Sequence, residues 1–151
     1  HDIDQLIKKA LATQRFAIEK AEFEIEWERS RKPLLAYVDP DATERILLNL
    51  IDNALKYAAD GKWLSIGAAA DVGMIVIRVT DRGPGIPVNQ REKIFTRFHR
   101  LDDQLTSQSG AGLGLSIAQM LAEGMNGSLQ CVTEPNHLGA TLELKLPRAN
   151  V

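Results

Sequence analysis

The sequence predicts an α/β (α+β) two-layer sandwich, in which a mixed, largely antiparallel sheet of about five strands carries helices on one face. Apolar residues at helical spacing alternate along the chain with segments of strict apolar-polar alternation. The strands come in hairpin pairs, which disfavours a doubly wound parallel sheet. With 151 residues, 44% of them hydrophobic and 25% charged, the chain has the composition of one globular domain over residues 1–151.

In the first half of the chain, apolar residues at helical spacing are followed by a segment of alternating apolar and polar residues, and then by a second segment with helical spacing. Apolar spacing predicts a helix over residues 3–14, and alternation predicts a strand over 23–27. A turn-rich patch precedes a short apolar strand expected at 34–38. Asp39-Pro40 is typical of a helix cap with proline in the first turn, so we expect a helix from about Pro40 to Ala58.

The second half begins with a hairpin, in which strands at 63–66 and 74–79 join through Asp71-Val72-Gly73 and Asp81 lies at the exit. The remaining elements are expected in this order: a short helix after Pro87 that carries Ile94, Phe95 and Phe98 as core anchors, a mobile polar loop at 100–109, a helix from Gly112 to about Glu123, a tight turn at Asn126-Gly127, and a terminal hairpin of strands 128–133 and 140–146.

Charge and cysteine content narrow the function classes. The formal charge of -2 comes from 18 basic and 20 acidic residues, which are interspersed, so we expect neither a nucleic-acid partner nor direct membrane contact. The single cysteine, Cys131, excludes an internal disulfide and suits a reduced core position in a cytoplasmic domain. No stretch resembles a transmembrane segment or signal peptide, and the start at His1 without a Met indicates an excised piece, with any membrane anchor outside the chain.

The predicted helix 40–58 carries an unusual polar stripe. Asn49, Asn53 and Lys56 are spaced by four and three residues, so their side chains share one side of the helix. Asparagine is a poor helix former, so two in one stripe indicate a function, with a solvated face as the alternative. Amide oxygens suit Mg²⁺, and the lysine supplies a point charge for phosphates. The opposite, core-facing stripe comprises Leu47, Leu50, Ile51, Ala54 and Ala58.

A first glycine-rich loop follows the hydrophobic strand that ends at Asp81. Gly83 and Gly85 flank Pro84, and glycine allows the backbone to approach a flat ligand closely. A carboxylate there can accept hydrogen bonds from an amino group such as that of adenine. An ordinary Gly-Pro turn is the alternative interpretation.

A second glycine-rich loop opens the helix that begins near Gly112. Gly110, Gly112 and Gly114 expose N–H groups that can meet phosphates at a helix N-terminus. A Rossmann fingerprint is excluded because no strand precedes the loop, and a Walker loop is absent. The histidines His99 and His137 lack clustered ligands for a metal site. Two arginines, Arg97 and Arg100, either turn toward phosphate or remain solvated.

These motifs and their order resemble the catalytic, ATP-binding domain of bacterial two-component sensor histidine kinases, a Bergerat (GHKL) fold shared with gyrase, chaperone and mismatch-repair ATPases and anti-sigma-factor kinases. Residues 49–57 resemble the N-box, 81–86 the first glycine box, 94–98 the F-box, and 110–115 the second glycine box. The resemblance implies catalytic roles for Asn49, Asn53 and Lys56, Mg²⁺ bound by the two asparagines, and ATP contacts from Asn53, Lys56, Tyr57, Asp81, Gly83, Gly85, Ile86, Arg97, Gly110, Ala111, Gly112, Leu113, Gly114 and Leu115.

The resemblance also implies what lies outside this chain. The phosphoacceptor motif is missing, because His1-Asp2 matches only its first two residues and lacks the following Arg and Pro. We therefore expect a domain that binds Mg-ATP and donates the γ-phosphoryl group to a histidine on a separate phosphoacceptor and dimerisation domain of a homodimeric, membrane-anchored parent kinase, whose phosphate then passes to a response regulator. The isolated domain should not phosphorylate itself.

Two other functions remain open for the same pocket. One is an anti-sigma-factor-type serine kinase, which an acid-stable phosphate on the acceptor would identify. The other is an ATP-gated conformational module, but those relatives usually carry a glutamate base in the N-box helix. Asn49 occupies the corresponding turn here, so we expect poor ATP hydrolysis.

Overall fold

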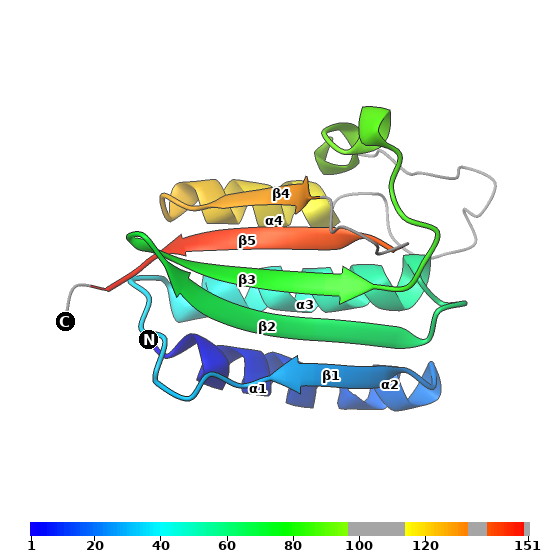
Figure 1. The fold of residues 1–151 in the computed structure, drawn as a ribbon, viewed down its shortest axis with the longest axis horizontal. Helices are drawn as coiled ribbons and strands as arrows, with labels where there is room; N and C mark the ends of the chain where they lie inside the picture. Colours follow the sequence, from blue (N-terminus) through cyan, green and yellow to red (C-terminus); the bar gives the residue numbers. More distant parts are fainter. Residues whose placement is uncertain (97–113, 133–138, 150–151) are drawn as a thin grey trace.

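The computed structural model describes residues 1–96, 114–132 and 139–149. Its centre is a five-stranded sheet in the order β1-β2-β3-β5-β4. Figure 1 shows the α-helices together on one face of this sheet, so the predicted two-layer sandwich is confirmed. In chain order the elements are α1 (Ile3–Thr13), α2 (Arg15–Lys20), β1 (Glu24–Glu28), α3 (Pro40–Tyr57), β2 (Trp63–Asp71), β3 (Met74–Asp81), η1 (Val88–Gln90), η2 (Lys93–Phe95), α4 (Gly114–Gly124), β4 (Ser128–Val132) and β5 (Thr141–Pro147).

The sheet is mixed, as the hairpin pattern predicts. Edge strand β1 pairs with β2 in parallel, and α3 lies between these two strands in the chain, as a parallel crossover requires. The β2–β3, β3–β5 and β4–β5 pairs are antiparallel. The β2–β3 hairpin turns at Val72-Gly73, where Gly73 has φ +68°. Both predicted hairpins are therefore confirmed.

The core lies between the sheet and the helices. Alternate residues of the inner sheet face, such as Ile75 and Ile77 of β3 and Leu144 of β5, are fully buried. They meet the apolar stripe of α3, whose Leu50 and Ile51 are also fully buried. Such burial supplies roughly 25 cal/mol for each Å² of apolar surface removed from water, so this interface is the main stabilising contact of the domain.

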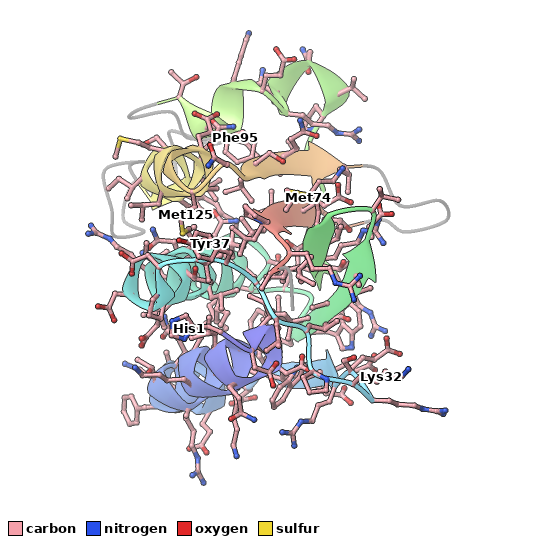
Figure 2. The ribbon with its side chains drawn as sticks, turned by 90° about the vertical axis from the view of Figure 1, so that its left-hand side faces the viewer. His1, Lys32, Tyr37, Met74, Phe95 and Met125 are labelled. Atoms are coloured by element: carbon pink, nitrogen blue, oxygen red, sulfur yellow. The ribbon has the colours of Figure 1, made fainter. Side chains whose placement is uncertain are left out.

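Helices α3 and α4 pack side by side under the sheet. Met125, just after α4, brings its sulfur 3.7 Å from Thr43 Oγ1 of α3, and Figure 2 shows Met125 between the two helices. Phe95 is buried at the far side of α4. The positions of Ile94 and Phe95 in the core confirm that they are anchors, whereas Phe98 lies outside the described residues.

Three sequence-based expectations need correction. The segment 34–38 is not a strand but makes isolated bridges, Asp2 with Leu35 and Ala36 with Arg148, because its backbone alternates between the chain start and the end of β5. The segment after Pro87 forms two 3₁₀ turns with i to i+3 hydrogen bonds. A second helix, α2, follows α1 where the apolar spacing predicted none.

Other boundaries match the sequence closely. Helix α3 begins at Pro40, after an Asp39 side chain that accepts from the backbone N–H groups of Asp41 and Ala42 at 2.9 and 3.2 Å. The turn at Asn126-Gly127 separates α4 from β4, and Asn126 has φ +62°. No helix within the described ranges has the length and apolar character needed to cross a membrane.

Candidate functional site

The polar stripe of helix α3 lies on the side of the helix opposite its buried stripe. Asn49, Asn53 and Lys56 are half-buried, whereas the opposite stripe is buried in the core as predicted. Tyr57, also half-buried, ends the helix. The buried stripe therefore fixes the rotation of the helix, and this rotation determines where the polar stripe faces.

Asn49 links α3 to the beginning of α4. Its amide nitrogen Nδ2 donates to the carbonyl oxygen of Gly114 at 3.1 Å. Because this bond uses the donor end of the amide, Asn49 presents its Oδ1 as an acceptor or as a hard ligand of the kind that Mg²⁺ takes. The donor set of the stripe therefore fits a Mg²⁺ ion that also binds phosphate oxygens.

Lys56 has a partner that the spacing argument missed. Its Nζ lies 2.9 Å from Asp52 Oδ2, one turn earlier on α3. The two side chains are 26% and 46% exposed, so the ion pair is partly solvated and contributes at most about 1 kcal/mol. A phosphate group approaching the stripe would compete with Asp52 for the ammonium group.

Asp81 is buried and tightly held at the end of β3. Its Oδ1 accepts from the backbone N–H of Gly83 at 2.9 Å and from that of Ala140 at 3.0 Å. The Asp81 N–H in turn donates to the Ala140 carbonyl at 2.9 Å. One carboxylate oxygen thus ties the loop after β3 to the residues that lead into β5.

Glycines surround Asp81 because side chains would not fit. A Cβ at Gly139 would overlap the Asp81 backbone and lie 2.9 Å from its Oδ1. A Cβ at Gly83 would lie 2.9 Å from the Cα of Ala58, so the expected close approach at Gly83 is made to the end of α3. Gly85 has φ +78°, a left-handed conformation that glycine adopts without strain.

Beside this loop lies a pocket of about 270 Å³. It is lined by Pro84 to Pro87, Arg91, Cys131, Val132, Gly139 and Ala140. Ile86 is half-buried and packs against the core from here. Burial raises the pKa of the Cys131 thiol. The positive charge of Arg91 partly offsets this rise in the pKa and the negative charge of Asp81 adds to it, so the thiol stays protonated at neutral pH. The pocket is therefore bordered both by the first glycine-rich loop and by the residues that lead into β5.

The elements that carry the candidate residues end or begin at the same side of the sheet. Figure 1 shows that α3 and β3 end there, and that β2 and β5 begin there. The structure thus brings the first glycine-rich loop to the C-terminal end of α3, although the two are 24 residues apart from Tyr57 to Asp81. Gly114, which is exposed, approaches the middle of α3 through its hydrogen bond with Asn49, and the half-buried Leu115 packs against the core.

Several predicted site residues lie outside the described residues: Arg97, Gly110, Ala111, Gly112 and Leu113, together with Arg100, His99, His137 and the expected loop 100–109. Within the described part of the chain, no group of three or more His, Cys, Asp or Glu side chains is arranged to hold a metal ion.

Sequence reasoning missed the surroundings of Asp81. Gly139 and Ala140 lie 58 and 59 residues after Asp81, and both contact it closely. One feature of the sequence could have indicated this contact. Gly139 directly precedes the alternating segment that forms β5, and the start of β5 lies opposite the end of β3 in an antiparallel pair. Arg91, whose Nε donates to the Ile86 carbonyl at 3.3 Å, was also not expected in the pocket.

Comparisons with known proteins agree with this geometry. The sequence profile described as "Histidine kinase-, DNA gyrase B-, and HSP90-like ATPase" matches residues 38–150. The sensor histidine kinase TmoS of Ectopseudomonas mendocina is 41% identical over 119 residues, covering 76% of this chain and 12% of that protein. The signal transduction histidine-protein kinase ArlS of Staphylococcus haemolyticus is 40% identical over 108 residues, covering 71% of this chain and 24% of that protein.

Solved structures give the same result. The mycobacterial sensor histidine kinase MprB superposes with a TM-score of 0.81 at 28% identity, over 100% of this chain and 97% of that one. Full-length ShkA in complex with AMPPNP superposes with a TM-score of 0.82 at 30% identity, over 100% of this chain and 31% of that one. The chain therefore spans only a small part of the length of the sequence relatives that it matches.

The packing around Asp81 makes a first prediction. Gly139→Ala should lower the free energy of unfolding by about 1–3 kcal/mol, because the added methyl group overlaps the Asp81 backbone. Gly124→Ala is the matched control, since no atom lies within 4 Å of its new Cβ. Urea unfolding of both variants measures the difference, and equal midpoints would contradict the described approach of residues 139 and 81.

Proposed function

The chain belongs to the histidine kinase-, DNA gyrase B- and HSP90-like ATPase family, and from this premise we propose that it binds Mg-ATP and donates the γ-phosphoryl group to a histidine on a separate domain. One observation supports the proposal. The loop that begins at Asp81 packs against the C-terminal end of α3, so the proposed base-recognition carboxylate lies near the end of the helix that carries the proposed metal and phosphate stripe.

Each candidate residue has a proposed role that follows from its chemistry. Asp81 accepts from the adenine amino group, and Gly83, Gly85 and Ile86 form the wall of the base pocket. Tyr57 packs against the adenosine. The second glycine-rich loop, 110–115, collects phosphate oxygens on its N–H groups, with Arg97 as an additional cation.

The polar stripe of α3 is proposed to act on the phosphates. Asn49 and Asn53 would hold Mg²⁺ through their amide oxygens, and Lys56 would exchange its contact with Asp52 for a phosphate oxygen. When bound, Mg²⁺ neutralises charge that develops on the transferred phosphoryl group. The contribution of this chain is to position and hold the triphosphate, because phosphoryl transfer needs little other chemistry from the protein.

The wider reaction depends on parts beyond this domain. The relatives are sensor histidine kinases or signal transduction kinases by name, and this chain spans 12% of one and 24% of the other. We therefore propose that the histidine acceptor belongs to a dimerisation domain of a homodimeric parent, and that a response regulator receives the phosphate. We further propose that residues 1–151 form a cytoplasmic catalytic domain of a membrane-anchored sensor.

Base recognition by Asp81 is testable with an isosteric change. Asp81→Asn keeps an oxygen for the N–H groups of Gly83 and Ala140 but replaces the second oxygen with a donor. ATP binding should weaken by about 1.5–3 kcal/mol, the size of a hydrogen bond to a charged group. Calorimetric titration with Mg-ATP and Mg-GTP measures this, with the exposed Asp60→Asn as control. Equal affinity of the unaltered protein for ATP and GTP would refute the role of Asp81.

The magnesium role of α3 predicts a loss of transfer without unfolding. Asn53→Ala should abolish Mg²⁺-dependent phosphotransfer to an added histidine domain, and Asn49→Ala should reduce it less severely. Asn89→Ala removes the same side chain from an exposed site in η1 and should have no effect. Radiolabel transfer and circular dichroism are measured together. Full transfer by Asn53→Ala, or a loss that merely follows unfolding, would argue for a structural role instead.

Because the chain contains no phosphoacceptor motif, we predict that the isolated chain binds ATP without phosphorylating itself. Incubation with γ-labelled ATP should give no radiolabel on residues 1–151, and label should appear on a cognate histidine domain added in trans. The transferred phosphate should be acid-labile, as phosphohistidine is. Label on His1 of the isolated chain would overturn the prediction, and an acid-stable phosphate on the acceptor would identify a serine kinase.

A further inference from the structure

We propose that Arg82 and Trp63 form a clamp, on the sheet face opposite the helices, that positions the Asp81 loop for nucleotide binding. Neither residue belongs to the candidate nucleotide contacts. The inference rests on the proposed function, because it assigns a positioning role within that same site. Two observations support this role: the stack of the Arg82 side chain on the Trp63 ring, and the close packing of the backbone around Arg82.

Strand geometry places the pair away from the nucleotide side. Leu64 of β2 is the register partner of Asp81 of β3, and Leu64 is fully buried in the core between sheet and helices. Trp63 precedes Leu64 on β2, and Arg82 directly follows Asp81, the last residue of β3; successive side chains of an extended backbone point to opposite faces. Asp81 therefore faces the helices, while Trp63 and Arg82 meet on the other face.

The contact itself is a cation–π stack. The Arg82 guanidinium carbon lies 4.1 Å from the centroid of the Trp63 ring. Trp63 is only 8% exposed although it stands outside the main core cluster, so the arginine covers a ring that would otherwise meet water. Trp63 is also anchored laterally, because it is paired in register with Glu24 of β1. The ring therefore stands on a strand that is paired on both sides.

The backbone on either side of Arg82 is equally confined. A Cβ at Gly61 would overlap the Arg82 carbonyl group, with its carbon at 2.6 Å. Gly61 is itself held to the end of α3 by its N–H, which donates to the Ala58 carbonyl at 3.0 Å. On the other side, Gly83 packs directly on Ala58. Arg82 therefore lies between two glycines that both contact the end of α3.

This arrangement controls the distance between the two halves of the proposed site. The end of α3 carries Lys56 and Tyr57, and the loop carries Asp81, so a shift of Arg82 moves base recognition relative to phosphate recognition. Holding the loop in place before binding lowers the ordering cost that nucleotide binding must overcome. Because the clamp does not touch the nucleotide, it should affect affinity without changing the preference for adenine.

The chain supplies its own matched control. Arg29 lies 4.7 Å from the centroid of the Trp27 ring on edge strand β1, so it makes the same type of stack two strands away from the strand that ends at Asp81. If the Arg82 stack only stabilises the fold, Arg82→Ala and Arg29→Ala should have similar effects on nucleotide affinity. A positioning clamp predicts that nucleotide affinity responds to Arg82 alone.

The first measurement is calorimetric titration of the purified chain with Mg-ATP, below the unfolding temperature of every variant. Arg82→Ala should weaken binding about two- to fivefold, the range that an exposed cation–π contact supplies. Arg82→Lys should restore part of the affinity because it keeps a cation over the ring, and Arg29→Ala should bind as the unaltered chain does. The ATP-to-GTP preference should be the same in all four proteins.

The second measurement uses the reciprocity of coupled equilibria. If the clamp strengthens nucleotide binding, nucleotide must strengthen the clamp by the same factor. In a Trp27→Phe background, Trp63 is the only tryptophan. Acrylamide should then quench Trp63 emission less when Mg-ATP is bound, and Arg82→Ala should remove this protection.

The outcomes separate the two proposals. If the unaltered chain binds Mg-ATP but Arg82→Ala binds it equally well, or if Arg29→Ala loses as much affinity, the clamp is refuted and the proposed function stands. Quenching that is insensitive to Mg-ATP also refutes the clamp. If the unaltered chain binds no Mg-ATP at all, the proposed function fails and the clamp fails with it.

Discussion

The paired hydrogen bonds to Asp81 Oδ1 are the interaction on which the rest of the site depends. One oxygen accepts from Gly83 in the loop and from Ala140 before β5, so it joins two segments that are far apart in the sequence. The bonds form only because Gly139 and Gly83 have no side chains, which lets both backbones approach the carboxylate. The position of Asp81 is therefore a property of packing as much as of the loop sequence.

Helix α3 connects this constraint to the core. Its buried stripe packs against the inner face of the sheet, and the same rotation leaves Asn49, Asn53 and Lys56 half-buried on the other side of the helix. Its end contacts Gly61 and Gly83, and its middle contacts Gly114 through Asn49. One helix thus sets the relative positions of the first loop and of α4, so core packing and site geometry cannot vary independently.

The solved chains that share this fold differ in length, since this chain spans 97% of the MprB chain but 31% of the full-length ShkA chain. Both superpositions extend over 100% of this chain, with TM-scores of 0.81 and 0.82. A domain organised around one helix and one carboxylate can keep its geometry within larger proteins, because the contacts that hold the described site come from within the domain.

The sequence by itself determined the two-layer class, the bounds of α3 and both hairpins, because these depend on local periodicity, a cap at Asp39 and turn residues such as Gly73. It also indicated Asp81 and the asparagine stripe through residue type and spacing. The sequence-based prediction of a strand at 34–38 was wrong, because the backbone hydrogen bonds of this segment go to two distant partners. The predicted short helix after Pro87 was also wrong, because the segment forms two 3₁₀ turns. Only the tertiary structure decided that Ala140 and Gly139 hold Asp81 and that Arg82 lies over Trp63. Most of these contacts join residues that are far apart in the chain, and all depend on side-chain direction, which a linear pattern does not encode.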